Sequence, residues 1–248
     1  MPPLARPFFT SSRLEGSRSS GASCTLCPAW YVLHMPTGKR VTVYLVRHGE
    51  TFWNRESRCQ GVTDIALSDK GYQQAHALTK VFSEKPLSLV LTSPLQRSRE
   101  TAAIIAKPHN LSIEIHDGLR EWNQGILEGL TGTALLRDHQ EYFQRWFQDP
   151  ARTAPPGGES LQMLQSRAWP VIDCLRERTL DNPIVVVSHT MSIATILCAA
   201  LSLDLAQVHR FRIDLASKSV LTFTPLGLFS SWVLTSLNDR HHLIGDLL

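Results

Sequence analysis

The 248-residue sequence contains no apolar run long enough to span a membrane and no internal repeat. Charged residues make up only 19% of the chain and hydrophobic residues 43%, which is typical of a soluble globular protein with a sizeable core. The length fits one large α/β domain or two small ones, and the composition does not change after residue 40. We therefore expect a soluble protein with one folded domain.

Excess positive charge is absent from the main part of the chain. The formal net charge is +3, but residues 1–40 contain five basic residues and one acidic residue and so carry +4, which leaves −1 for residues 41–248. A nearly neutral domain gives no electrostatic argument for nucleic acid or an anionic membrane as a partner. We expect neither partner.

Cysteines are few, and their odd number argues against a set of disulfides. The five thiols are scattered along a chain large enough to fold without cross-links, so we expect free thiols and a cytoplasmic location. Cys24 and Cys27 have the spacing of half a zinc site, but no second pair of cysteines or histidines follows at a usable distance. The sequence therefore predicts no metal site and implies no cofactor.

Residues 1–34 have no hydrophobic periodicity, contain one acidic residue and are rich in Ser, Arg and Pro. Such a segment is expected to be disordered. Two explanations remain open: the segment is an organellar transit peptide, or translation starts at Met35 and the upstream residues are a misassigned extension. We treat residues 1–40 as an extension outside the fold and residues 41–248 as the domain. A real transit segment would imply an organellar location.

Strand and helix patterns alternate along the domain. Short runs rich in Val, Ile and Leu predict strands over residues 41–46, 87–92, 112–115, 184–187, 220–224 and 231–237. Apolar residues at helical spacing, after N-cap residues or prolines, predict helices over residues 68–83, 94–106, 131–149, 160–180 and 190–201. This alternation predicts a mostly parallel sheet covered on both faces, with the last two strands at its edge.

Polar residues follow three of the predicted strands at the point where each strand ends. Arg47 and His48 follow the first, Arg97 lies one helical turn after the second, and His189 follows the most hydrophobic one. The carboxyl ends of parallel strands lie side by side, and ligands bind there. We therefore expect the two arginines and two histidines to converge. Guanidinium groups bind phosphate through paired hydrogen bonds, and a histidine nitrogen is nucleophilic at neutral pH.

The motifs around these residues resemble those of the histidine phosphatase superfamily (branch 1), the phosphoglycerate mutase-like enzymes. They occur in the family's order. The matching segments are Leu45–Thr51 with Asn54, Ser93–Arg97 with Thr101 and Ala102, Leu119–Glu121 with Gly125, Glu128 and Gly129, Pro156–Ser160, and Ser188 with His189. The resemblance implies a three-layer α/β/α sandwich with a mostly parallel central sheet. It also implies a metal-independent mechanism through a phosphohistidine intermediate.

The resemblance further implies roles for individual residues. His48 would be the nucleophile and Glu121 the proton donor. The phosphate pocket would consist of Arg47, Arg97 and His189. Asn54 would be a further phosphate contact, and Gln60 and Gly61 would lie at the substrate entrance.

The chemistry of phosphoryl transfer calls for the same residue types. A phosphate dianion must be held while a neutral imidazole attacks in line, and two guanidinium groups with a protonated His189 would supply the charge. The same cations disfavour a proton on His48. Nearby phosphate charge would raise the pKa of Glu121, which could then protonate the leaving alkoxide and later accept a proton from water.

One position departs from the family's pattern. Relatives usually have glycine after the second histidine, where this chain has Thr190. The Thr190 side chain would either narrow the pocket, as a substrate-contacting group, or cap the following helix through its hydroxyl. We expect it to affect rate and substrate size more than the type of reaction.

Mutase-like members of the family have Thr-Gly-Trp after the first motif, basic residues after the acidic one, and an insertion in the middle of the domain. This chain has Gln60-Gly61-Val62 after the first motif and Trp122-Asn123 after the acidic residue, and its domain is short. We therefore expect a histidine acid phosphatase-type phosphoric monoester hydrolase acting on a small phosphorylated metabolite. Two alternatives stay open, a phosphoglycerate mutase and an inactive phosphate-binding domain.

Specificity would come from residues 131–159, a predicted cap over the pocket. Its arginines would either meet an acidic substrate or form plain surface charge; they are Arg137, Arg145 and Arg152. The sequence is compatible with a monomer or a homodimer.

Overall fold

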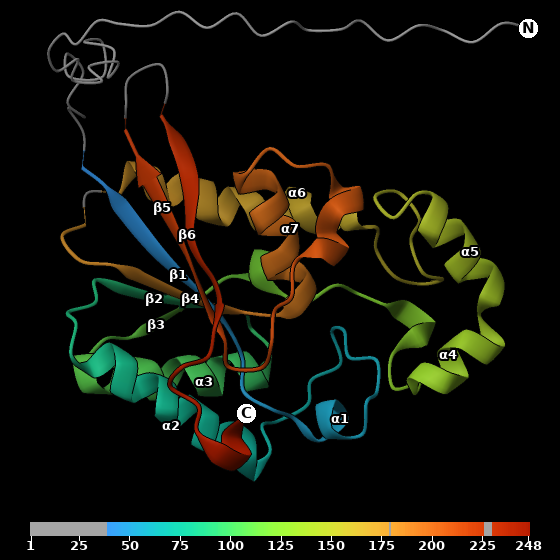
Figure 1. Cartoon of the computed structure of the whole chain (residues 1–248), viewed down its shortest axis with the longest axis horizontal. Helices are drawn as coiled ribbons and strands as arrows, with labels where there is room; N and C mark the ends of the chain where they lie inside the picture. Colours follow the sequence, from blue (N-terminus) through green and yellow to red (C-terminus); the bar gives the residue numbers. More distant parts are fainter. Residues whose placement is uncertain (1–38, 179, 226–229) are drawn as a thin grey trace, which may run out of the picture. The chain divides into compact units, whose positions relative to one another are not determined.

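The computed structural model describes residues 39–178, 180–225 and 230–248, and a six-stranded sheet forms its centre (Figure 1). The strands lie in the order β3-β2-β4-β1-β5-β6. Their bounds are β1 Val41–Arg47, β2 Leu89–Thr92, β3 Ile113–Ile115, β4 Ile184–Ser188, β5 Lys218–Thr224 and β6 Ser231–Asp239. The first four strands pair in parallel, while β5 pairs antiparallel with β1 and with β6. The mostly parallel sheet is confirmed, but only β6 of the last two strands lies at the edge.

Helices cover both faces of the sheet, α2 and α3 on one and α6 and α7 on the other (Figure 1). Side chains along β4 alternate between the two cores, as the period of two in a strand requires. Val186 packs in the same core as Ile172 of α6, and Val187 packs with Ile105 of α3. Each of these four side chains is fully buried, which stabilises the fold by about 1.5–3 kcal/mol per residue. The predicted three-layer architecture is confirmed.

The helices begin and end close to the predicted positions. Their bounds are α1 Phe52–Arg55, α2 Asp69–Ser83, α3 Gln96–Ala106, α4 Gly132–Asp138, α5 Gln140–Gln148, α6 Leu161–Asp173 and α7 Thr190–Ala200. Short 3-10 helices occupy Lys107–His109, Asp117–Leu119, Gly125–Leu127, Cys174–Glu177, Leu205–Arg210 and Gly245–Leu247.

Two helix boundaries differ from the sequence-based ones. Helix α6 ends at Asp173, where the backbone tightens into a 3-10 turn, rather than continuing to residue 180. The first residue of α3 is Gln96 and its N-cap is Leu95, so Pro94 precedes the helix instead of opening it. The predicted N-cap of α2 is confirmed because the hydroxyl of Ser68 accepts a hydrogen bond from the backbone N–H of Gly71. Ser160, where the predicted helix starts, caps α6 in the same way.

Helices α4 and α5, which we call the lid, stand apart from the sheet on the side where β1 leads into α1 (Figure 1). They are the helical segments predicted over residues 131–149. Tyr142 of α5 is buried, and Trp146 packs against Trp122 with 6.4 Å between ring centroids. Aromatic burial therefore attaches the lid to the loop that follows β3.

Within the described ranges, no helix combines the length and apolar character that crossing a membrane requires. The predictions made for residues 1–34, including the half zinc site of Cys24 and Cys27, fall outside the described residues.

Candidate active site

The strand ends converge as the sequence predicts. Arg47 is the last residue of β1, and the backbone N–H of His48 donates to the carbonyl of Ser188 at the end of β4, with 3.1 Å between the atoms. The imidazoles of His48 and His189 face each other with 5.0 Å between ring centroids. Arg97 reaches the same place from the first turn of α3. Parallel strand pairing thus brings together residues that lie up to 142 positions apart.

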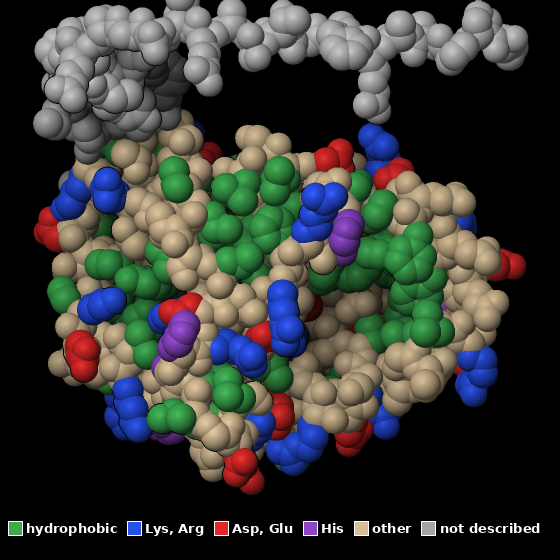
Figure 2. Space-filling model, in the orientation of Figure 1, with side chains coloured by type: hydrophobic (Ala, Val, Ile, Leu, Met, Phe, Trp, Pro, Cys, Tyr) green, Lys and Arg blue, Asp and Glu red, His purple; other side chains and the backbone are tan. Residues whose placement is uncertain are grey.

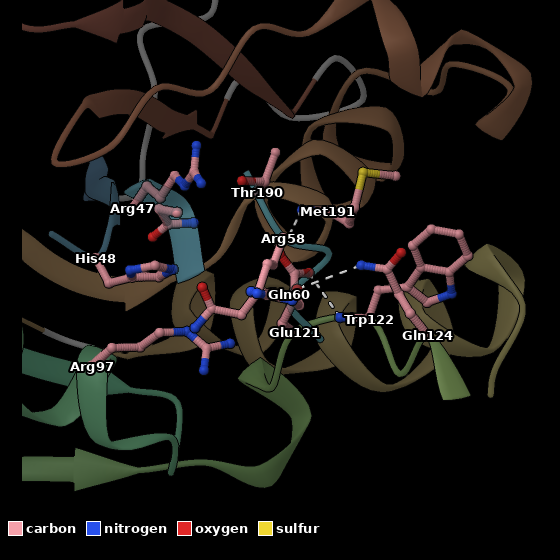
Figure 3. Close-up of a pocket in the computed structure, with 11 residues that line it drawn as sticks. Arg47, His48, Arg58, Gln60, Arg97, Glu121, Trp122, Gln124, Thr190 and Met191 are labelled. Atoms are coloured by element: carbon pink, nitrogen blue, oxygen red, sulfur yellow. Dashed lines mark hydrogen bonds between the residues drawn. The ribbon is translucent and has the colours of Figure 1, made fainter. Parts of the chain in front are cut away.

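A pocket of about 280 Å³ opens at this edge of the sheet (Figure 3). Its lining combines three arginines with one carboxylate and an apolar side: Arg47, His48, Asn54, Arg58, Gln60, Arg97, Glu121, Trp122, Gln124, Thr190 and Met191. Figure 2 shows that this face of the molecule is hollowed beside the lid, with hydrophobic side chains along the lid and Lys and Arg side chains on the other side of the hollow. The pocket is therefore suited to an anionic ligand with a small apolar part.

His48 is held as a neutral imidazole. Its Nδ1 lies 2.7 Å from the carbonyl oxygen of Gly49, which can only accept, so Nδ1 carries the proton and Nε2 keeps its lone pair. Burial lowers the pKa of His48 well below the ordinary value for histidine, and Arg97 and Arg47 lower it further. His48 therefore presents a nucleophilic nitrogen at neutral pH.

Gly49 brings the His48 loop against the first turn of α2. A Cβ at position 49 would lie 2.4 Å from the carbonyl oxygen of Gly71, closer than any side chain can be placed. Glycine is thus required for this close approach.

Arg47 and Arg97, which we call the cradle, are held in place by hydrogen bonds to backbone carbonyls. Arg97 is fully buried and donates to the carbonyls of Thr63 and Gly61 over 3.0 and 2.7 Å, while Arg47 donates to the carbonyl of Ile213 over 2.8 Å. Among the described residues neither Nε atom has a hydrogen-bond partner. A bound oxyanion would satisfy such buried donors. Burial lowers the pKa of each arginine to about 10, so both stay charged at neutral pH.

Gly61 supports Arg97 and is not part of the pocket lining. A Cβ at this position would lie 2.6 Å from the carbonyl oxygen of Trp122, so the residue type is set by close backbone packing. Of the two residues that the resemblance places at the substrate entrance, only Gln60 lines the pocket.

The charge state of His189 differs from the sequence-based expectation. The residue is fully buried, and its Nε2 lies 2.8 Å from the hydroxyl of Ser93. Burial lowers the pKa of His189 well below the ordinary value, and Arg97 lowers it further, so the imidazole is neutral at pH 7. The positive charge of the cradle comes from the two arginines, and only the field of a phosphate dianion would favour a proton on His189.

Glu121 is the only carboxylate in the pocket lining, and it is 5% exposed. It accepts hydrogen bonds from the backbone N–H groups of Trp122, Met191 and Ser192 over 2.7, 3.2 and 3.2 Å. Burial raises the pKa of Glu121 above its ordinary value even though these bonds oppose the shift. Burial, which the sequence analysis did not invoke, thus prepares Glu121 to carry a proton.

Arg167 of α6 fixes the loop that carries Glu121. Its guanidinium donates to the carbonyls of Gly118, Arg120 and Glu121 over 2.8–2.9 Å and to the carboxylate of Glu159. Five donors in a rigid fork suit this multiple contact. The loop is therefore tied to α6 on the side away from the pocket.

Asn54 lines the pocket from α1. Its side-chain oxygen accepts from the backbone N–H of Thr51 over 3.1 Å, as part of a capping box. This bond orients the amide so that its NH₂ group remains a donor for a ligand.

The model of the histidine phosphatase superfamily (branch 1) matches residues 43–240. The chain belongs to this superfamily. It is 35% identical to phosphoserine phosphatase 1 of Hydrogenobacter thermophilus over 73% of this chain and 86% of that protein. It is 32% identical to a probable phosphoglycerate mutase, GpmB, of Yersinia pestis over 81% of this chain and 94% of that protein.

Solved structures of phosphatases have the same fold as this histidine phosphatase superfamily member. A mycobacterial glucosyl-3-phosphoglycerate phosphatase superposes with a TM-score of 0.73 and 28% identity, covering 82% of this chain and 100% of that chain. A mutant phosphoserine phosphatase of Entamoeba histolytica in complex with phosphoserine gives a TM-score of 0.72 and 26% identity, with the same coverage. The protein is a phosphatase or mutase of this family.

Thr190 of this family member lies in the first turn of α7 and lines the pocket. The N-cap of α7 is His189, and in the part of the chain that the structure describes no side chain caps this helix. Of the two alternatives for Thr190, the structure therefore supports the narrowed pocket and not the helix cap.

Four residues of the lining had no binding role predicted from the sequence: Arg58, Trp122, Gln124 and Met191. Arg58 lies two positions before Gln60, in the loop that the family's pattern places at the substrate entrance. This short distance in the sequence could have indicated that Arg58 lines the pocket. Gln124 and Met191 come from loop and helix positions with no motif of their own. In the described parts of the chain, no group of three or more His, Cys, Asp and Glu residues is arranged to hold a metal ion.

Proposed function

We propose that this protein is a phosphoric monoester hydrolase of the histidine acid phosphatase type, which acts on a small phosphorylated metabolite through a phosphohistidine formed on His48. The observation that carries the proposal is a neutral His48 between the buried Arg97 and the partly buried Arg47, in one pocket with a carboxyl group of raised pKa. Nucleophile, anion site and proton donor are the three parts that metal-free phosphoryl transfer requires.

In the first step Nε2 of His48 attacks the phosphorus atom, and the bond between phosphorus and the ester oxygen breaks. Glu121 gives its proton to that oxygen, so an alcohol leaves. In the second step Glu121 takes a proton from water, the resulting hydroxide attacks phosphorus, and the bond to Nε2 breaks. Inorganic phosphate leaves, and Glu121 is again protonated.

The arginines stabilise the charge that spreads over the three equatorial oxygens in both steps. A unit charge at 4 Å contributes about 4 kcal/mol at an effective dielectric constant of 20, before desolvation is subtracted. Arg47 and Arg97 are already desolvated and fixed by carbonyls, so little reorganisation is needed when substrate binds.

Hydrolysis is favoured over mutase activity by the residues next to the acid. Trp122 and Asn123 follow Glu121, where mutase-like members carry basic residues. The phosphatases among the relatives point the same way, and their names suggest phosphoserine and glucosyl-3-phosphoglycerate as substrates to test first. Phosphoglycerate mutase activity is the second candidate because GpmB is a relative of similar identity.

The test is phosphate release from p-nitrophenyl phosphate by the purified full chain. We expect His48→Ala to abolish turnover and to abolish an acid-labile phosphate label on the protein. The matched control is His76→Ala, because His76 is an exposed residue of α2 outside the pocket. Wild-type protein that neither releases phosphate nor traps the label would contradict the proposal, and conversion of 3- to 2-phosphoglycerate at a higher rate than hydrolysis would favour the mutase.

A further inference from the structure

The pocket contains a third guanidinium group, which the phosphate cradle does not use. Arg58 lines the pocket together with Arg47 and Arg97 but comes from the loop after α1. In the view of Figure 3 it lies between the cradle on one side and Trp122 and Gln124 on the other. Its side chain is 39% exposed, whereas Arg97 is fully buried. Arg58 therefore lies at the mouth of the pocket.

The Arg58 side chain is fixed in place. Its Nε donates to the carboxylate of Glu56 over 2.5 Å, and its Nη1 donates to the carbonyl of Gly129 over 2.8 Å. The Arg58 backbone donates to the carbonyl of Trp53 and bridges to Thr131. Neither side-chain bond uses Nη2, so a preorganised donor remains for a ligand.

A second donor lies two residues away. The side-chain nitrogen of Gln60 is buried and has no hydrogen-bond partner within the described residues, while its oxygen accepts from the hydroxyl of Thr51 over 2.8 Å. Gln60 also lines the pocket. A guanidinium with a neighbouring amide N–H is a donor set that suits a planar carboxylate.

The balance of charge also leaves room for a second anionic group. Arg47 and Arg97 match the two charges of a phosphate dianion. Glu56, the partner of Arg58, is 54% exposed, and an exposed ion pair of this kind is weak. Trp122 and Met191 line the same pocket and offer an apolar surface for a short carbon chain.

We propose that Arg58, assisted by Gln60, binds a carboxylate of the substrate, so that the enzyme selects small phosphorylated carboxylic acids over phosphate esters without a carboxylate. This inference rests on the proposed phosphatase function and adds the class of substrate. The pocket volume of about 280 Å³ suits a molecule with only a few carbon atoms between the two anionic groups.

The experiment compares two substrates that differ only in the carboxylate, O-phosphoserine and O-phosphoethanolamine. We expect wild-type protein to have the higher kcat/KM for O-phosphoserine. Arg58→Gln should lower the ratio of the two kcat/KM values by about 10-fold or more, the effect of losing a charged hydrogen bond, mainly through KM. Arg58→Lys, which keeps the charge without the planar fork, should give an intermediate ratio.

The matched control is Arg99→Gln, since Arg99 is an exposed arginine of α3 outside the pocket lining, and it should keep the wild-type ratio. Equal kcat/KM values for both substrates in wild-type protein would overturn the carboxylate site. So would an Arg58→Gln variant with a wild-type ratio. Both results leave hydrolysis of p-nitrophenyl phosphate and the histidine label intact, whereas failure of the proposed function removes these two signals from the wild-type protein itself.

Discussion

His48 and Glu121 show how burial has opposite consequences for two kinds of titratable side chain. Burial disfavours the charged form in each case, so it lowers the pKa of the imidazole and raises that of the carboxyl group. Burial therefore widens the pH range in which the imidazole of His48 is neutral and the carboxyl group of Glu121 is protonated. In exposed groups the imidazole has the higher pKa, so both shifts favour the combination of a neutral base and a protonated acid.

We predict that kcat/KM for an alkyl phosphate rises as His48 loses its proton, well below the ordinary histidine pKa, and falls as Glu121 loses its own. Glu121→Gln should remove the alkaline limb and lower the maximum by about 100-fold or more, the usual contribution of a general acid. The measurement is a pH profile of both proteins with one substrate. Ionisation of the substrate affects both profiles equally, so an alkaline limb that persists in the variant would exclude Glu121 as the acid.

At the scale of elements, the strand ends position the cradle and α6 positions the acid. Arg167 donates to the carbonyls of three residues of this loop, Gly118, Arg120 and Glu121, yet its side chain is outside the pocket lining. It is a positioning residue rather than a catalytic one. A misplacement of about 1 Å at a reacting group can cost 10²-fold in rate.

We therefore predict that Arg167→Met lowers kcat by about 100-fold while KM changes much less, because phosphate is bound by other residues. Arg167→Lys should recover part of kcat, since an ammonium group can replace some of the carbonyl contacts. The readout is steady-state kinetics with the unfolding temperature measured in parallel. Arg176→Met serves as control because Arg176 pairs with Asp173 on the outer side of the same segment. A variant that loses stability but keeps kcat would show that Arg167 only holds the fold.

The sequence predicted most of the elements because hydrophobic periodicity and capping residues act locally. Ser68 caps α2 as expected, and the strand ends carry Arg47 and His189 to one edge. Which strands become neighbours is a tertiary property, so the interior position of β5 was not predicted. The neutral state of His189 was missed for the same reason, because it depends on burial that no local pattern encodes. The place of Arg58 in the pocket was also not predicted, because its contact with Gly129 joins residues that are 71 positions apart.

At the scale of the whole molecule, the two imidazoles of the site link its protonation state to the stability of the fold. His48 and His189 are buried with lowered pKa values, so they bind protons less readily in the folded chain than in the unfolded one. Their contribution to stability is complete above the ordinary histidine pKa and is lost as the pH falls below it. Where the unfolded imidazole is protonated and the folded one is not, each costs about 1.4 kcal/mol per pH unit.

We predict that the free energy of unfolding in urea decreases between pH 7.5 and 5.5, and that it decreases less steeply in His48→Gln, which removes one of the two groups. Other titratable residues affect both proteins alike, so the difference between the two slopes reports His48. The raised pKa of Glu121 acts in the opposite direction, because a carboxyl group that keeps its proton when folded stabilises the chain as the pH falls. Identical slopes for the two proteins would mean that folding does not lower the pKa of His48, and this result would contradict the buried, neutral imidazole on which the proposed mechanism is built.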